Sequence, residues 1–186
     1  MSASLDLTEL GAAGTVGPGA LDQLRLRRAF STFPTGVAAL AAVVDGRPEG
    51  IAVSSFTSVS LEPAMVLVCV AHTSMTWPRL STAPRLGVSV LAADQEQALR
   101  QLSARTDDRF AGLAWRALDS GAILLDGASG WFECSVEQQN EAGDHNIVVL
   151  RVHDHGDHAV APLVFHGSRV RRLHPEPSAE CQRGGR

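Results

Sequence analysis

Short apolar runs of strand length recur along most of this chain, and turn-forming residues separate them. Aliphatic residues dominate these runs, as is usual for strands that bury at least one face. The runs lie at residues 37–44, 64–71, 85–92, 123–125, 130–138, 145–153 and 163–173. Many short strands with few helices between them favour a β-barrel or sandwich over a parallel α/β sheet. The sequence therefore predicts a mainly β (α+β) fold.

Three short helices are expected to flank these strands. They are predicted at residues 21–33, 74–82 and 94–104. The first is amphipathic, with Asp22 near its start. Asp94 is expected to be the N-cap of the third helix, with Gln97 at the capping-box position. A polar loop at residues 106–112 should follow this helix.

The chain is predicted to form one domain between two tails. Residues 1–20 are rich in Gly and Ala and lack hydrophobic periodicity, so we expect a flexible N-terminal tail. The domain should span residues 21–174, and residues 175–186 should form a flexible C-terminal tail. The total of 186 residues suits one domain with a sizeable core, because domains commonly have about 100–200 residues.

Composition excludes several classes of function. All sixteen basic residues are arginine, and the chain has neither lysine nor tyrosine. Schiff-base catalysis by lysine and acid catalysis by tyrosine are therefore ruled out. A net charge of -4 without a dense arginine run argues against a nucleic-acid partner. We find no signal peptide and no apolar run of membrane-spanning length, so we expect a cytoplasmic protein without a membrane partner.

Neither the cysteines nor a histidine-rich segment predicts a metal site. The three cysteines, at positions 69, 134 and 181, are scattered and form no CxxC pair or disulfide pattern. Residues 153–158 contain His153, His155 and His158 together with two aspartates. These side chains could bind a divalent cation loosely, but their spacing fixes no tetrahedral geometry. We therefore predict that the protein has no functional metal site.

Residues 50–63 form a strand-like segment with an unusual number of hydroxyl groups. The hydroxyl residues are Ser54, Ser55, Thr57, Ser58 and Ser60. Strand alternation places Ile51, Val53, Val59 and Leu61 on one face, toward a core, and Ser54, Phe56, Ser58 and Ser60 on the other. The polar face could line a site for a flat, partly phosphorylated ligand, or it could belong to a partly solvated edge strand. The segment alone leaves both interpretations open.

Two other places carry side chains suited to binding. A turn delivers Asp144 and His145 to the start of an apolar strand, where His145 could donate a hydrogen bond to a ligand or transfer a proton. The alternative is an ordinary surface turn in which the aspartate bonds its own backbone. In the polar loop, Arg109 could clamp a phosphate while Phe110 stacks on a base. A Ser-His-Asp hydrolase is disfavoured, because the chain has no G-x-S-x-G elbow.

Seven segments occur in an order that resembles a known family. They are residues 33–37 (FPTGV), 50–63 (GIAVSSFTSVSLEP), 66–70 (VLVCV), 109–110 (RF), 131–134 (WFEC), 142–145 (AGDH) and 162–165 (PLVF). Their order and spacing, over residues 21–173, resemble the small flavin reductase family, the reductase components of two-component flavin-dependent monooxygenases.

The resemblance implies an FMN-binding split β-barrel with a few flanking helices, usually in a homodimer. It implies that NADH or NADPH reduces FAD or FMN, and that the reduced flavin passes to a partner monooxygenase. By the same resemblance, His145 would be the catalytic residue beside the nicotinamide. The flavin-binding residues would be Pro34, Thr35, Gly36, Ser54, Ser55, Phe56, Thr57, Ser58, Ser60, Ala71, Ser74, Arg109 and Phe110.

The chain departs from the family pattern at two positions. Leu150 stands where a glycine is frequent, and Val170 stands where an aromatic residue is usual. The second departure weakens the expectation of a flavin-edge contact there.

Three alternative functions are a split-barrel flavin-binding protein without reductase activity, an oxidase that retains its flavin, and a metal-dependent enzyme using residues 153–158. The sequence does not decide between FAD and FMN or between NADH and NADPH.

Overall fold

The computed structural model describes residues 22–106 and 108–173, so the two predicted tails lie outside the described residues. The helices are α1 (Gln23–Phe30), α2 (Trp77–Leu80) and α3 (Glu96–Ser103). The strands are β1 (Thr35–Gly36), β2 (Ala38–Val44), β3 (Arg47–Val53), β4 (Thr57–Leu61), β5 (Ala64–Ala71), β6 (Leu86–Val90), β7 (Trp115–Ala117), β8 (Ile123–Leu125), β9 (Gly130–Ala142), β10 (His145–Asp157), β11 (Val164–His166) and β12 (Arg169–Arg171).

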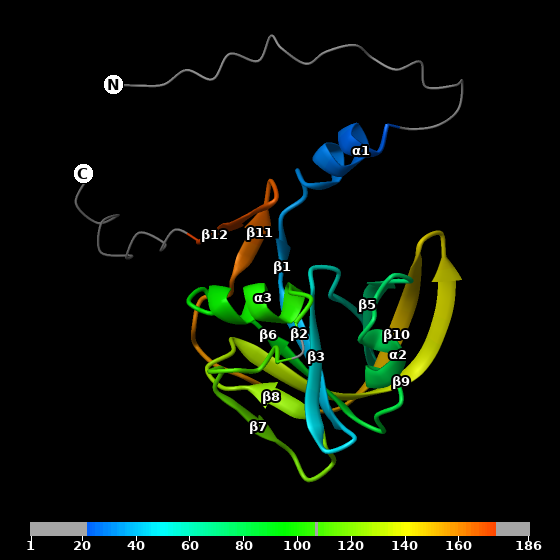
Figure 1. The fold of residues 1–186 in the computed structure, drawn as a ribbon, viewed down its shortest axis with the longest axis vertical. Helices are drawn as coiled ribbons and strands as arrows, with labels where there is room; N and C mark the ends of the chain where they lie inside the picture. Colours follow the sequence, from blue (N-terminus) through cyan, green and yellow to red (C-terminus); the bar gives the residue numbers. More distant parts are fainter. Residues whose placement is uncertain (1–21, 107, 174–186) are drawn as a thin grey trace, which may run out of the picture.

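An antiparallel seven-stranded sheet, in the order β3-β2-β6-β9-β10-β5-β4, forms the body of the molecule. The sheet curls around a core, and α3 lies across one end of it, while the β7–β8 hairpin lies at the opposite end of Figure 1. The pairing of β9 with β10 shifts register twice, after Val149 and after Val152. Such irregularities bend strands, which helps a sheet to close. The mainly β prediction is confirmed.

β2 is apolar at every position because the core covers both of its faces. Ala38, Leu40 and Ala42 belong to one buried cluster, and Ala39 and Ala41 belong to a second. The first cluster fills the curl of the sheet, and the second lies under α3 and β8. A strand between two cores reads as a continuous apolar run, which is why the sequence predicted it accurately.

The hydroxyl-rich segment is two strands rather than one. β3 ends at Val53 and β4 begins at Thr57, with a bend between them. Sequence alternation predicted that Val59 and Leu61 face the core. That prediction is wrong beyond the bend, because the two residues are 46% and 95% exposed in this chain. β4 forms one edge of the sheet and pairs only with β5, so its polar residues match the edge-strand interpretation.

Other differences from the prediction lie at turns and helix starts. The segment 163–173 splits into β11 and β12 around Gly167 and Ser168, both at positive φ. The N-cap of α3 is Gln95 rather than Asp94, and no side chain caps this helix. The Gln95 amide oxygen instead accepts from the Ala92 N–H at 2.9 Å, which holds the turn ahead of α3. Asp22 does cap α1, by accepting from two backbone N–H groups, although α1 ends at Phe30.

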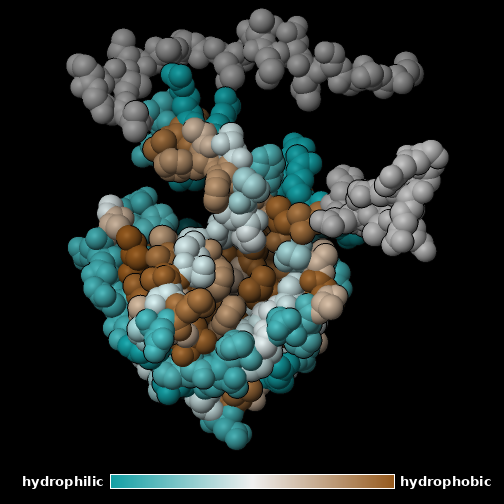
Figure 2. Space-filling view, turned by 180° about the vertical axis from the view of Figure 1, so that it is seen from behind, coloured by the Kyte–Doolittle hydropathy of each residue, from teal (hydrophilic) through white to brown (hydrophobic). Residues whose placement is uncertain are grey.

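Apolar surface remains uncovered in two places. α1 projects from the barrel (Figure 1) and buries none of its residues, and Leu24 and Phe30 are largely exposed on it. From behind, hydrophobic residues also gather across the middle of the barrel, within a hydrophilic surround (Figure 2). Patches of this kind on a folded domain mark surfaces that other molecules cover.

Within the described residues, no helix has both the length and the apolar character that a membrane crossing requires.

Candidate functional site

A cavity of about 410 Å³ opens where β3, β5 and β10 meet the end of α3. It lies between the bend after β3, the segment that joins β5 to α2, and the start of β10. Six of the residues predicted for the site line it: Ser54, Ser55, Ala71, Ser74, Arg109 and His145. Segments far apart in the sequence, from Ile51 to His145, are thus brought together around one space, as the ordered motifs suggested.

His145 enters this cavity with a fixed ring orientation. It is the first residue of β10 and lies opposite Ala71 on β5. Its Nδ1 is 2.7 Å from Oδ1 of Asp144, and hydrogen bonding to the imidazole lowers the pKa of the Asp144 carboxyl. Because an ionised carboxylate only accepts, Nδ1 carries the proton, and Nε2 remains available to a ligand. The Asp144 carbonyl oxygen also accepts from the His72 N–H at 3.0 Å, which ties this turn to the end of β5.

Ser54 and Ser55 have different roles in the bend after β3. The Ser55 hydroxyl donates to the Cys69 carbonyl oxygen at 3.1 Å and accepts from the Cys69 N–H at 2.8 Å. Both bonds stay within the protein, so Ser55 fastens the bend to β5. Ser54 is exposed at the cavity wall, and no side-chain hydrogen bond of its hydroxyl is recorded among the described residues. Of the two hydroxyls, that of Ser54 is the one available to a ligand.

This difference predicts opposite effects of two alanine substitutions. Ser55→Ala is expected to lower the free energy of unfolding by about 1–2 kcal/mol, because it removes two hydrogen bonds. Ser54→Ala should change stability by less than about 0.5 kcal/mol and should instead weaken flavin binding. Urea denaturation and flavin fluorescence titration of both variants measure these effects. An unchanged flavin dissociation constant in Ser54→Ala would count against its place in the site.

Arg109 lies at the boundary of the cavity and is held from two sides. Its Nη1 donates to the Gly50 carbonyl oxygen at 3.0 Å and to the Thr76 hydroxyl at 2.6 Å. Phe110, in contrast, is buried in the second core cluster, with its ring edge-on to Trp115 at 5.8 Å between centroids. The Phe110 ring therefore supports the loop from beneath, and the structure does not bear out the suggestion that it stacks on a base from this loop.

The other predicted flavin-binding residues lie outside the cavity. Thr35 and Gly36 form β1, which pairs with β11, and Pro34 precedes them. The Phe56 ring stacks on Phe132, with 5.5 Å between centroids. Thr57, Ser58 and Ser60 lie along the edge strand β4. These seven assignments stay predictions, and in a single chain the cavity reaches none of these residues.

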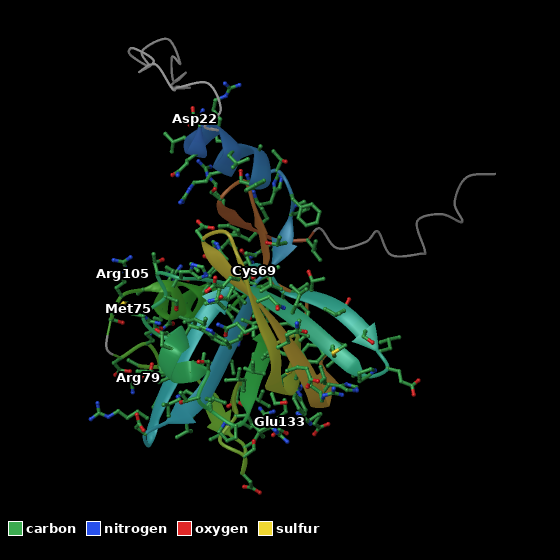
Figure 3. The ribbon with its side chains drawn as sticks, turned by 90° about the vertical axis from the view of Figure 1, so that its right-hand side faces the viewer. Asp22, Cys69, Met75, Arg79, Arg105 and Glu133 are labelled. Carbon is green, nitrogen blue, oxygen red and sulfur yellow. The ribbon has the colours of Figure 1, made fainter. Side chains whose placement is uncertain are left out.

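Several cavity residues escaped sequence analysis. They are Met75 and Thr76 ahead of α2, and Leu102, Ser103 and Arg105 at the end of α3. Figure 3 shows Arg105 and Met75 close together on one side of the molecule. None of these residues belongs to a local motif, so only the packing of α2 and α3 against β3 could reveal them.

The histidine-rich segment forms no metal site in the part of the chain that the structure describes. No three His, Cys, Asp or Glu side chains are grouped there as metal ligands would be. His153 lies on β10, and its Nε2 is 2.8 Å from the Ser135 hydroxyl on β9.

The thiol of Cys134 is buried beside Glu133, and burial raises its pKa to about 12, so it is not a reactive nucleophile.

The protein is thus a curled antiparallel β-barrel with a cavity lined by hydroxyl groups and a histidine at its strand ends. The chain matches the family described as "Flavin reductase like domain" over residues 30–174. It belongs to this family, and the resemblance inferred from the ordered segments is confirmed.

Individual relatives agree with this membership. The chain is 36% identical to a flavin reductase of Pseudomonas putida, over 73% of this chain and 80% of that protein. It is 32% identical to the reductase subunit HsaB of a flavin-dependent monooxygenase from Rhodococcus jostii, over 91% of this chain and 88% of the relative. Among solved structures, the NADH:FAD oxidoreductase SgcE6 of Streptomyces globisporus, in complex with NAD and FAD fragments, superimposes with a TM-score of 0.79. That match has 38% identity and covers 88% of this chain and 99% of the other. The split-barrel prediction is thereby confirmed.

Proposed function

We propose that this protein is an NAD(P)H:flavin oxidoreductase that reduces FAD or FMN and supplies the reduced flavin to a partner monooxygenase. The observation that carries the proposal is that His145, Ser54 and Ser74 line the same cavity, in a chain of the flavin reductase family. The names of its relatives support the flavin, the nicotinamide nucleotide and the monooxygenase partner. A cytoplasmic location stays a prediction of the sequence.

The residues around the cavity fit a flavin and a nicotinamide. Its volume of about 410 Å³ lies in the range of small-molecule sites, about 300–1,000 Å³, and its walls combine aliphatic residues with hydroxyl groups. When bound, the two cofactors supply the hydride chemistry, so the chain has to orient them rather than provide an acid or a base. A protein without lysine or tyrosine can meet that requirement.

Three side chains have defined tasks in this proposal. His145 would hold the nicotinamide through Nε2, because Nδ1 is bonded to Asp144. The Ser74 hydroxyl already accepts from the Trp77 N–H at 3.1 Å, so its own proton can be donated to a ligand. Ser54 would add a second hydroxyl from the end of β3. Donors of this kind stabilise the negative charge that a flavin gains on reduction.

We further propose a homodimer, joined through the outer face of β5 and β10. Val68 and Val148 point into the core, so their neighbours Leu67, Ile147 and Val149 lie on the outer face, where they are only half-buried. His145 lies in register on that face, so a second chain would border the cavity. Sedimentation equilibrium should give twice the chain mass of 19.7 kDa, and a monomer at micromolar concentration would contradict the dimer.

The reductase activity is tested by crossing both nucleotides with both flavins. Purified protein is expected to oxidise NADH or NADPH in proportion to added FAD or FMN under anaerobic conditions, followed by absorbance. Oxidation no faster than the protein-free background would refute the proposal. A tightly bound flavin that NADH cannot bleach would instead favour a flavin-binding protein without reductase activity.

A further inference from the structure

Arg109 is fixed through one end of its guanidinium and offers the other end to a ligand. Its Nη1 donates to the Gly50 carbonyl oxygen at 3.0 Å and to the Thr76 hydroxyl at 2.6 Å. An arginine Nη1 carries two hydrogens, so these two bonds use both of them. The Nε and Nη2 hydrogens remain, and they form the edge of the guanidinium that binds two oxygens of one phosphate. Among the described residues, no hydrogen bond from this edge is recorded.

The charge of Arg109 is not paired within residues 22–106 and 108–173, where no carboxylate forms an ion pair with it. Glu49, the residue before Gly50, is paired with Arg79 instead, at 2.7 Å between Oε1 and Nη1. Among the described residues that line the cavity around His145, none is Asp or Glu, whereas Arg105 and Arg109 both line it. A half-buried guanidinium in such a cavity attracts an anionic ligand.

The Thr76 hydroxyl can hold Arg109 because it does not cap α2. Thr76 occupies the N-cap position, where a threonine hydroxyl usually accepts from a backbone N–H of the first turn. Its φ of -92° and ψ of -36° are helical rather than extended, and its side chain makes no capping bond. The Ser74 hydroxyl accepts from the Trp77 N–H in its place, at 3.1 Å. Thr76 is only 5% exposed, so packing fixes the position of its hydroxyl.

Gly50 holds the same segment from β3. Its carbonyl oxygen accepts from Arg109, and its lack of a side chain leaves room for Phe110, because a Cβ atom there would lie 2.8 Å from the Phe110 ring. The backbone of β3 therefore sets where this segment lies. The Thr76 hydroxyl then decides how the guanidinium is turned, since it binds the second hydrogen of the same Nη1.

We propose that Thr76 is a positioning residue, which turns Arg109 so that its Nε and Nη2 hydrogens face a phosphate group of the bound ligand. The family resemblance implies that Arg109 contacts the flavin, but it assigns no role to Thr76. The inference rests on the proposed function, because that function supplies a ligand with a phosphate. Two sources carry this group, the flavin as FMN or FAD and the nicotinamide nucleotide as NADH.

The test removes the Thr76 hydroxyl from the full-length chain. Thr76→Val keeps the shape of the side chain, Thr76→Ser restores the hydroxyl, and Thr76→Ala replaces Thr76→Val if the valine variant does not fold. Thr82→Val is the matched control, because the Thr82 hydroxyl, just after α2, donates to the Arg79 carbonyl oxygen at 2.7 Å outside the cavity.

Three constants are measured on each variant. Fluorescence titration without NADH gives the dissociation constants of FMN and of riboflavin, which lacks the phosphate. The KM for NADH is measured with riboflavin as the acceptor, so that only the nucleotide carries phosphate.

In Thr76→Val, FMN affinity is expected to fall about three- to tenfold, riboflavin affinity to stay unchanged, and Thr76→Ser to restore the loss. A rise in the KM for NADH that Thr76→Ser reverses would show that the nucleotide phosphate binds Arg109, instead of the flavin phosphate or in addition to it. Equal losses for FMN and riboflavin, a loss that serine does not restore, or constants equal to those of Thr82→Val overturn the inference. The flavin constants require no turnover, whereas wild-type protein that does not oxidise NADH would refute the reductase function alone.

Discussion

Gly87→Ala is expected to destabilise the protein severely, by about 3 kcal/mol or more. Gly87 lies on β6 in the middle of the seven-stranded sheet, paired with Ala41 on β2 and Glu133 on β9. A Cβ atom at this position would lie 1.9 Å from the Ile123 carbonyl oxygen and 2.6 Å from its carbon. These are backbone atoms of β8, whose three side chains are buried, so no side-chain rotation relieves the clash. The β7–β8 hairpin would have to move away from β6.

The loss should be visible as a melting temperature about 6–12 °C below wild type, followed by circular dichroism. Gly130→Ala is the matched control, because Gly130 pairs with Val90 on the same β6 ladder and its Cβ would meet only Gly156, at 3.5 Å. That variant should melt within about 2–4 °C of wild type. A Gly87→Ala protein as stable as the control would show that β8 does not pack closely on β6.

The parts of the fold that the sequence predicted are those governed by local pattern. The run of β2 was recognised because both faces of the strand are buried, and α1 because Asp22 caps it. The sequence indicated a strand that runs into a bend, but not where the bend lies, because its position depends on a bond from the Ser55 hydroxyl to Cys69, fourteen positions away. Alternation alone cannot show that a strand stops, and it assigned Val59 and Leu61 to a core they do not reach.

The candidate site was predictable only where chemistry and motif coincide. His145 and Ser54 were recognised as polar groups in otherwise apolar strands. Phe110 was misread, because its burial depends on Gly50, where a Cβ atom would lie 2.8 Å from the Phe110 ring. Met75 gave no local signal, because it lines the cavity only through the packing of the segment ahead of α2 against the strands.

His145→Ala is expected to raise the KM for NADH by up to about tenfold while changing the flavin dissociation constant by less than about threefold. The lost group is one hydrogen-bonding nitrogen, Nε2, which contributes about 0.5–1.5 kcal/mol to binding. Steady-state kinetics at saturating flavin and fluorescence titration of the flavin measure the two constants. His153→Ala is the control, because His153 lies on the same strand and bonds Ser135 outside the cavity around His145. A larger effect on flavin binding than on the KM would reject the nicotinamide assignment.

Asp144→Asn then separates the presence of the imidazole from its orientation. The asparagine oxygen can still accept from Nδ1, but without the charge, so the ring is held less firmly at the same 2.7 Å contact. We expect a rise in the KM for NADH smaller than in His145→Ala, and no further rise when His145→Ala and Asp144→Asn are combined. Additive effects would mean that Asp144 acts on the ligand directly rather than through His145. Non-additive effects assign Asp144 to positioning, because an aspartate that only orients the imidazole has nothing to contribute once the imidazole is gone.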